Sequence, residues 1–396
     1  MKIGLIRIVA GVLLGSLPVS SSEIMRTPRV VWSGAYSQDD WMDESPCLIS
    51  GPDNGIYVVG RSSKRTGEQY KTRLWIWRLD GRGHRVWARA LDAIETSENR
   101  DISWSKVVGD PRERVFLAQE SPPQTGLWLI RFDPEGQTVS TKRLVFKGLP
   151  EIWRLAQTRE GLFVAGRASK KDGGDAWISK LDPNGAVLWE KTYDHGQSEC
   201  AHALEVHGDG GFVWAASSGT LNKFGAGPSK VWVAVCDAHG KILRDKTLEG
   251  RHPTLGSRPN GHLVLCYNAA DLFQVRQQIM GLDSSLNPVW GPHLVFDGEG
   301  LGMYALLSDS AGNTVVAGST FGALRLWTYS PQGQALGSVS VKEQFTGPLV
   351  NALILQDDAI FLAAAGRELA PEKIQAERAR TSSDLMDILI AKIQSP

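Results

Sequence analysis

One short pattern recurs along this chain and limits its possible folds more than any other feature. The clearest copy, DAWISKLDPNGAVLWEKTY at residues 175–193, joins two apolar-alternating segments through a four-residue turn. Alternation with a period of two is typical of β-strands. Asp182, Pro183 and Gly185 suit successive positions of such a turn. The pattern therefore predicts a β-hairpin that is repeated.

Related turns recur at nearly constant spacing along the sequence. They begin at Asp80, Asp133, Asp237, Asp283 and Ser330. The mean interval is about 52 residues, close to the roughly 40 to 50 residues of known propeller repeats. Trp lies five residues before four of the turns and seven residues after three of them, so most of the 14 Trp residues are expected to be architectural.

Each hairpin follows two further apolar segments, such as residues 152–156 and 161–166, so each unit holds four strands. Residues 387–394 align on 175–182, but the chain then ends before a fourth strand. Residues 30–36 align on that fourth strand, 187–193. We therefore predict an all-β fold, a seven-bladed β-propeller of four-stranded blades, closed by the N-terminal strand completing the last blade.

The first 22 residues have the features of a secretory signal peptide. Lys2 and Arg7 precede an apolar run of about ten residues, which is followed by small residues. Such a run is too short for a transmembrane helix, which needs about 20 residues. We expect a signal peptide at 1–22, a single propeller domain at 23–396, and a periplasmic or secreted protein.

The charge balance narrows the range of partners. Lys+Arg and Asp+Glu both number 43, which gives a formal net charge of +0. Nucleic-acid and anionic-membrane proteins need a basic surplus, so neither class is expected. We predict instead a monomer with a protein partner in the cell envelope, no transmembrane segment and no cofactor.

The sequence GDAWISKLDPNGAVLW at 174–189 resembles the repeat of bacterial secreted β-propellers related to the quinoprotein-like and WD-repeat groups. The resemblance implies a fold, and such folds carry many functions. Quinone-binding members have a vicinal Cys pair, whereas no two of the four Cys residues here are adjacent. Quinone binding is therefore not inferred.

His195, Cys200 and His202 lie close together in sequence and could bind zinc, with Glu199 or Asp194 as the fourth ligand. The alternative is a loop in which His202 merely begins an inner strand. Two disulfides are possible among Cys47, Cys200, Cys236 and Cys266. However, Cys236 and Cys266 occupy core positions of the repeat and are expected to be buried thiols.

Basic residues follow the second strand of several units, where a propeller carries connections on the face that usually binds. The candidate partner-binding residues are Arg61, Lys64, Arg65, Arg167, Arg367, Lys373, Arg378 and Arg380. Basic loops also serve solubility, which is the alternative reading. Residues 368–384 form the longest insertion, with a short helix predicted after Pro371, and we expect it to belong to a partner site.

The chain has none of the HExxH, GxSxG or GxxxxGK[ST] motifs of common enzymes. The favoured function is therefore a protein-binding scaffold that uses the loop face. One alternative is a carbohydrate or small-ligand binder that stacks Trp41, Trp104 or Trp153 on its ligand. Another is a hydrolase or lyase at the central channel that uses His195, His202 and Glu199. The sequence does not specify the ligand or partner.

Overall fold

A computed structural model describes the chain in fifteen stretches. These are residues 28–36, 42–66, 69–90, 102–109, 114–120, 127–147, 150–170, 173–207, 210–219, 229–269, 275–298, 305–320, 323–343, 345–368 and 387–394. The predicted signal peptide, and the insertion from residue 369 onward, lie outside the described residues. Within those stretches no helix is long and apolar enough to cross a membrane.

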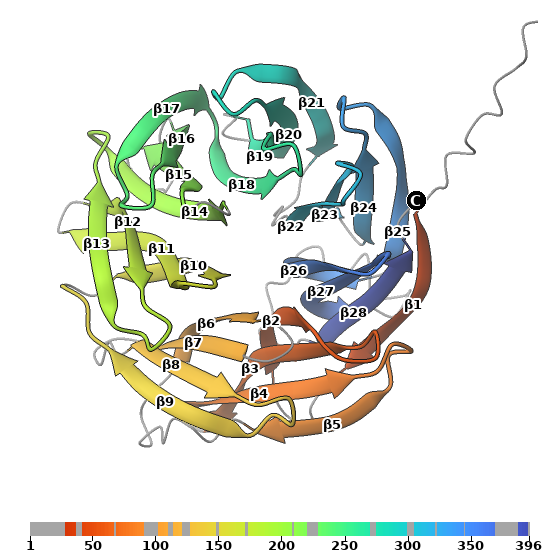
Figure 1. Ribbon diagram of the computed structural model, residues 1–396. Coiled ribbons are helices and arrows are strands. Elements are labelled where there is room, and N and C mark those ends of the chain that lie inside the picture. Colours follow the sequence, from red (N-terminus) through yellow and green to blue (C-terminus); the bar gives the residue numbers. More distant parts are fainter. Residues whose placement is uncertain are drawn as a thin grey trace, which may run out of the picture.

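The described residues form seven four-stranded antiparallel sheets arranged in a ring, with one strand of each sheet toward the centre (Figure 1). We number the blades in chain order: blade 1 is β2–β5, blade 2 is β6–β9, blade 3 is β10–β13, blade 4 is β14–β17, blade 5 is β18–β21 and blade 6 is β22–β25. The seventh sheet has the order β26, β27, β28, β1. The chain is therefore a β-propeller.

In the first three blades the four strands pair in chain order, from the inner strand to the outer strand. Their bounds are β2 Met42–Ser50, β3 Ile56–Thr66, β4 Gln69–Leu79, β5 Arg85–Ala90, β6 Ile102–Gly109, β7 Arg114–Glu120, β8 Leu127–Phe132, β9 Thr138–Leu144, β10 Glu151–Thr158, β11 Gly161–Lys170, β12 Gly173–Leu181 and β13 Val187–Tyr193.

The remaining blades follow the same plan. Their bounds are β14 Ser198–Val206, β15 Phe212–Gly219, β16 Ser229–Cys236, β17 Ile242–Glu249, β18 Arg251–Ser257, β19 Leu263–Asn268, β20 Val275–Leu282, β21 Pro288–Gly298, β22 Ala305–Ser308, β23 Thr314–Thr320, β24 Ala323–Tyr329, β25 Ala335–Glu343, β26 Phe345–Gln356, β27 Ala359–Glu368, β28 Asp387–Gln394 and β1 Arg29–Tyr36.

The repeated hairpin turn between the third and fourth strands is confirmed. In blade 3 the amide of Gly185 donates to the carbonyl of Asp182 over 3.0 Å, and the amide of Ala186 donates to Oδ1 of Asp182 over 2.7 Å. Gly185 has a φ of +74°, which favours glycine. In blade 5 Leu286 adopts this conformation with a φ of +64°, and its side chain is buried.

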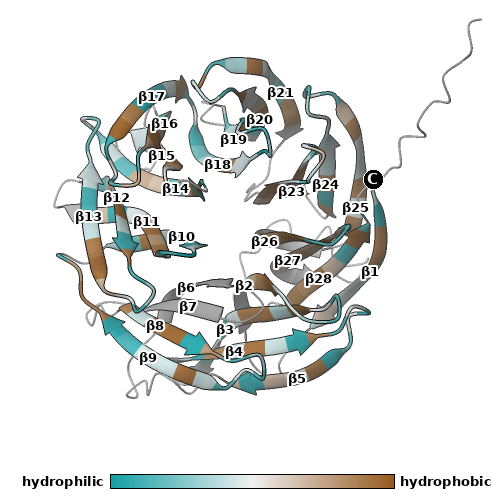
Figure 2. Cartoon of the chain, in the orientation of Figure 1, coloured by the Kyte–Doolittle hydropathy of each residue, from teal (hydrophilic) through white to brown (hydrophobic). Residues whose placement is uncertain are grey.

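Adjacent blades pack through aromatic residues of one outer strand and the turn of the next blade. Trp189 and Tyr193 of blade 3 lie against Gly240 in the blade 4 turn, and the Tyr193 hydroxyl donates to the Gly240 carbonyl over 2.8 Å. The core therefore lies between blades. Figure 2 shows the corresponding contrast, with hydrophobic residues along β26 and hydrophilic residues along much of the outer strand β9.

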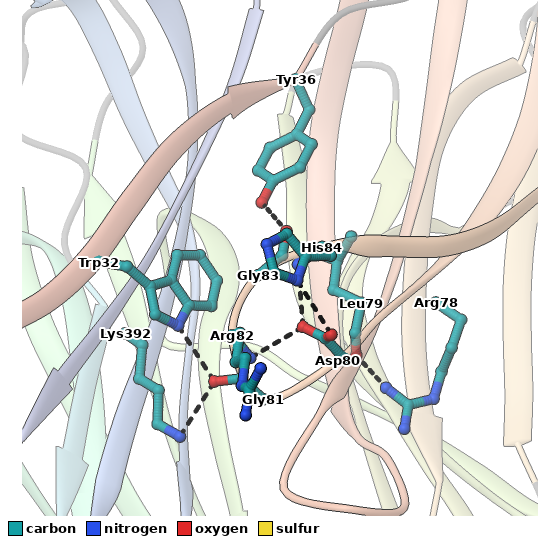
Figure 3. Close-up of polar contacts among 10 residues, drawn as sticks. All are labelled: Trp32, Tyr36, Arg78, Leu79, Asp80, Gly81, Arg82, Gly83, His84 and Lys392. Carbon is teal, nitrogen blue, oxygen red and sulfur yellow. Dashed lines mark hydrogen bonds and ion pairs between the residues drawn. The ribbon is translucent and has the colours of Figure 1, made fainter.

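The first described strand lies beside the last one. β1 pairs antiparallel with β28, and Trp32 is in register with Lys392 (Figure 1). Nε1 of Trp32 and Nζ of Lys392 both donate to the carbonyl of Gly81 in blade 1, over 3.2 and 3.3 Å. The Tyr36 hydroxyl donates to the carbonyl of Gly83 in the same turn (Figure 3). Residues far apart in sequence therefore join the two ends of the ring.

We call the face with the Asp/Gly turns the turn face. The opposite face, the loop face, carries the connections between second and third strands and those between blades. On the loop face the structure corrects one expectation: β3 and β4 stay paired as far as Thr66 and Gln69. Arg61, Lys64 and Arg65 therefore belong to a long hairpin of paired strands rather than to a loop.

The inner strands also differ from expectation. β10 begins before residue 152, and β14 begins before residue 203. Each strand contains a β-bulge near its start, which lies between Ile152 and Arg154 in β10 and between Ala201 and Ala203 in β14. A bulge adds one unpaired residue and changes the direction of the side chains around it. The repeat pattern does not reveal this extra residue.

None of the four cysteines, which all lie in the described residues, forms a disulfide. Cys236 and Cys266 are buried, which confirms the prediction for both, and Cys47 is buried as well. Cys200 is half-buried in β14.

Candidate functional site

The inner strands of blades 3, 4 and 5 bring charged and aromatic side chains together near the centre of the ring. β10, β14 and β18 each start at the loop face and run toward the turn face. Arg154 and Glu205, on β10 and β14, are the charged residues furthest along these strands. We call the group formed by Glu151, Trp153, Arg154, Arg167, Cys200, His202, Glu205 and His252 the central polar cluster.

Arg154 is the arginine of the cluster that lies on an inner strand, β10. Its Nη1 donates to the neighbouring carbonyl of Trp153 over 2.9 Å, and within the described residues no carboxylate oxygen lies within 4.0 Å of its guanidinium. The side chain is half-buried, and its removal from water lowers its pKa. Because a guanidinium has five N–H donors, Arg154 retains donors that are not used by the described residues.

Glu205 is the acidic counterpart of Arg154. Burial raises its pKa from 4.5 to about 7, while Ser257 and the charge of Arg154 act in the opposite direction. The cause is the cost of removing a carboxylate from water, which exceeds the attraction of the nearby cation. At neutral pH this carboxyl group is therefore divided between its neutral and charged forms.

His202 lies between two other rings of the cluster. Its ring centroid is 5.4 Å from that of Trp153 and 5.6 Å from that of His252, with edge-to-face geometry in both pairs. Burial, and then the charges of His252, Arg154 and Arg167, lower the pKa of His202 to about 3. His202 is therefore a neutral imidazole over the whole physiological range.

Arg167 and Glu151 form an ion pair at the loop-face edge of blade 3. Nη2 of Arg167 is 2.8 and 2.7 Å from the two carboxylate oxygens of Glu151. Both charges act on Cys200, whose pKa rises to about 12 because burial dominates. Cys200 is therefore a neutral thiol and not an activated nucleophile.

The structure separates the three residues of the predicted zinc site. The ring of His195 packs against Trp232, with centroids 4.8 Å apart, whereas His202 packs against Trp153. In the described part of the chain, these two histidines and Cys200 are not among the residues whose ligand atoms are close enough to share one ion. The bulge after Ala201 contributes to this separation.

The basic residues predicted to bind a partner have different placements. Arg167 joins the central polar cluster, while Arg61 and Lys64 lie half-buried on β3. Arg65 and Arg367 lie in β3 and β27, and nothing is described of their side chains. The remaining residues, Lys373, Arg378 and Arg380, fall outside the described residues.

Sequence reasoning missed Arg154 and Glu205. A signal was present, because each is a charged residue within an otherwise apolar inner strand, in IWRLA and AHALEV. Charged residues in such strands are rarely buried without a reason. Trp153, one of the Trp residues proposed to stack on sugars, is engaged with His202, whereas Trp41 lies outside the described residues and nothing is described of the Trp104 side chain.

Two hollows lie between neighbouring blades toward the turn face. One, of about 430 Å³, is lined by residues of blades 4 and 5 that include His207 and Arg244. The other, of about 640 Å³, is lined by Trp290, His293 and Tyr329 of blades 5 and 6. Neither hollow includes a residue of the central polar cluster.

The comparisons with known proteins agree with the fold and go no further. No family model matches the chain, and no curated protein matches it. Among solved structures, the Dos1 propeller is similar with a TM-score of 0.53 and 11% identity over 93% of this chain and 95% of that one. A chain from the crystal structure of BBS1N in complex with ARL6DN, soaked with lead, has a TM-score of 0.49 and 11% identity over 91% and 98%. At 11% identity the likeness to the Dos1 propeller shows a β-propeller only, and the quinoprotein-like or WD-repeat assignment stays a prediction.

Proposed function

We propose that this β-propeller is a protein-binding scaffold in the cell envelope that receives an acidic segment of its partner at the loop face, against the central polar cluster. The observation that supports this proposal most directly is Arg154, a half-buried guanidinium whose one hydrogen bond within the described residues is to the adjacent peptide group. A carboxylate from a partner would pair with the unused donors in two parallel hydrogen bonds.

The surroundings of Arg154 support this choice of partner chemistry. Partial burial removes part of its hydration, so an incoming anion meets a cation that is less solvated than one on an open surface. The neighbouring cysteine is a thiol and supplies no anion, and Glu205, the nearby acid that interacts with the Arg154 charge, is only partly ionised at neutral pH. Arg167 adds a second positive charge at the loop-face side, although Glu151 neutralises it in the free protein.

The test is affinity capture from an envelope extract with three forms of the chain. These are the unchanged chain, Arg154→Gln, and Arg143→Gln, a matched loss of charge on the exposed outer strand β9. Proteins retained by the unchanged chain and by Arg143→Gln, but lost from Arg154→Gln, are then purified and titrated directly. We expect Arg154→Gln to weaken binding by roughly 30-fold, as for a charged hydrogen-bonded pair.

A purified partner that binds Arg154→Gln and the unchanged chain equally would contradict the central placement of the site. A fourth form that lacks residues 368–384 separates the two parts of the proposal. If this form loses the partner while Arg154→Gln keeps it, the scaffold function stands and the contact lies at the blade with the insertion.

A further inference from the structure

Three carboxylates from two neighbouring blades meet on the loop face, outside the central polar cluster. Asp175 lies near the start of β12 in blade 3, Asp194 follows the end of β13, and Glu199 is the second residue of β14 in blade 4. One carboxylate oxygen from each residue lies within 4.8 Å of the other two. β12 and β14 both start at the loop face, and the link between blades 3 and 4 lies at the same face. The fold therefore brings these three side chains together.

Glu199 provides the observation that distinguishes this group from an ordinary acidic surface. Its side chain is fully buried at 0% exposure. Oε1 accepts hydrogen bonds from the Ser218 hydroxyl at 2.8 Å and from the amide of Gln197 at 3.0 Å. Oε2 is buried, and among the residues that the structure describes it has no hydrogen-bond partner. A buried carboxylate oxygen without a donor is costly, and it needs a proton or a cation.

The neighbouring charges favour a cation at this place. Burial raises the pKa of Glu199. Hydrogen bonds from the Ser218 hydroxyl and from the amides of Gln197 and His195 act in the opposite direction, and the negative charge of Asp194 raises the pKa again because it opposes ionisation. Within the described residues no Lys or Arg nitrogen lies within 4.0 Å of the Glu199 carboxylate. Glu199 is therefore a buried acid with no cationic side chain of the described residues beside it.

In blade 1 an acid, Asp43, occupies the position that corresponds to Glu199. There a basic side chain of the protein supplies the opposite charge. Asp43 begins inner strand β2 opposite Ser62, as Glu199 lies opposite Ser218, and each serine hydroxyl donates to its acid. The charges of Asp43 and Arg73 interact, and Arg73 is the neighbour of Ser62 on β4. The residue in the place of Arg73 in blade 4 is Lys230, which is exposed and forms no ion pair with Glu199.

We propose that Asp175, Asp194 and Glu199 bind a calcium ion at the junction of blades 3 and 4. All three ligands are carboxylate oxygens, which hard cations prefer. Ca²⁺ binds oxygens at about 2.3–2.6 Å, so two oxygens roughly 4.8 Å apart can lie on opposite sides of one ion, and the third needs at most a small side-chain shift. Mg²⁺ requires oxygens at about 2.0–2.1 Å in near-octahedral geometry, which brings its ligands closer together. Water and backbone carbonyls would complete the coordination of calcium.

The experiment is a calorimetric titration of the chelator-treated full chain with CaCl₂ at pH 7.5, with thermal unfolding in parallel. We expect one calcium ion per chain, a dissociation constant of about 10⁻⁴ to 10⁻³ M as in extracellular calcium modules, and a rise in Tm with calcium. Glu199→Gln keeps the shape of the side chain and should weaken calcium binding at least tenfold. MgCl₂ should bind more weakly than CaCl₂.

Asp43→Asn is the matched control, since it removes a buried acid from the corresponding place in blade 1. It should lower the Tm without calcium, yet leave the calcium affinity within about twofold of the unchanged chain, because the change lies outside the proposed site. Asp194→Asn is the second test variant, since Asp194 is exposed and its change should not impair folding. It should also weaken calcium binding.

Three outcomes would overturn the proposal. One is the absence of both heat and a Tm shift up to 10 times the highest expected dissociation constant, which would mean that Glu199 holds a proton instead. Another is unchanged affinity in Glu199→Gln and Asp194→Asn. The last is loss of binding in Asp43→Asn alone, which would place the ion in blade 1.

Discussion

At the scale of single residues, the central polar cluster contains two titrating groups whose pKa values move in opposite senses. Glu205 is harder to ionise than in water because burial disfavours its charged form, and His202 is harder to protonate for the same reason. Each shift makes the free energy of unfolding depend on pH. The two groups affect the free energy of unfolding over overlapping pH ranges. As the pH rises, the contribution of Glu205 lowers stability and that of His202 increases it.

Glu205→Gln should make the protein relatively more stable at high pH. The carboxyl group has a pKa of about 7 in the folded state and 4.5 otherwise, so the folded state binds more protons between these values. Its contribution is fully present below pH 4.5 and is lost as the pH rises through about 7. The free energy of unfolding of Glu205→Gln, relative to that of the unchanged chain, should increase across this pH window by on the order of 2–3 kcal/mol.

Urea unfolding of both forms at pH 5, 6, 7 and 8 measures this effect. Glu199→Gln, whose acid lies at the junction of blades 3 and 4, is measured alongside as a separate buried acid. A constant difference between Glu205→Gln and the unchanged chain across these pH values would show that Glu205 ionises normally.

His202→Gln should reduce the loss of stability in acid. The pKa of His202 is about 3 in the folded state and 6.5 otherwise, so the unfolded chain binds the extra proton between these values. The unchanged chain therefore loses on the order of 2–4 kcal/mol as the pH falls from 6.5 toward 3, and the variant lacks this loss. The measurement is the slope of the unfolding free energy from pH 6.5 to 4. Equal slopes in the two forms would contradict the buried neutral imidazole.

At the scale of elements, the recurring hairpin turn combines a local requirement with a contact between blades. Gly136 in the blade 2 turn has a φ of +76°, and a methyl group added there would lie 2.5 Å from Cη2 of Trp87 in blade 1. Gly261, between β18 and β19, has the same φ, and nothing lies within 4 Å of such a methyl group. A comparison of alanine substitutions at the two glycines therefore separates the cost of backbone strain from the cost of the packing clash.

Gly136→Ala should destabilise the protein more than Gly261→Ala. Both changes cost about 1 kcal/mol for an alanine in the left-handed region, and only Gly136→Ala also displaces the Trp87 ring, for roughly 1–3 kcal/mol more. Urea unfolding of the two variants at one pH gives the difference directly. Equal losses would mean that Trp87 moves away at no cost.

These turns also show where prediction from the sequence succeeds. Asp182, Pro183 and Gly185 specify a turn through interactions within five residues, so the pattern predicts it in every copy. Strand lengths at the loop face were mispredicted, because pairing from Arg61 to Thr66 depends on the partner strand β4 and not on local preference. The group of Asp175, Asp194 and Glu199 joins two blades, and only the assembled ring reveals it.

At the scale of the whole molecule, strand β1 joins the two ends of the ring. It lies in one sheet with the last three strands of the chain, although it is far from them in sequence. β1 supplies the outer edge of the sheet formed by β26, β27 and β28. It also contacts blade 1 through Trp32 and Tyr36, and Lys392 of β28 binds the same turn (Figure 3). Without β1, the edge of β28 would be exposed and the contact between neighbouring blades would be weakened.

A chain that begins at residue 37 should therefore be less stable and more prone to aggregate. It loses the hydrogen bonds between β1 and β28 and the packing of Trp32 against Phe361, whose ring centroids are 6.3 Å apart. A peptide of residues 28–36 added in excess should restore the urea midpoint, because it binds only the folded form. The same peptide with Trp32→Ala should restore it less, since removal of a packed Trp costs about 3–5 kcal/mol. An unchanged midpoint in the shortened chain, or equal rescue by both peptides, would show that β1 does not hold the ring closed.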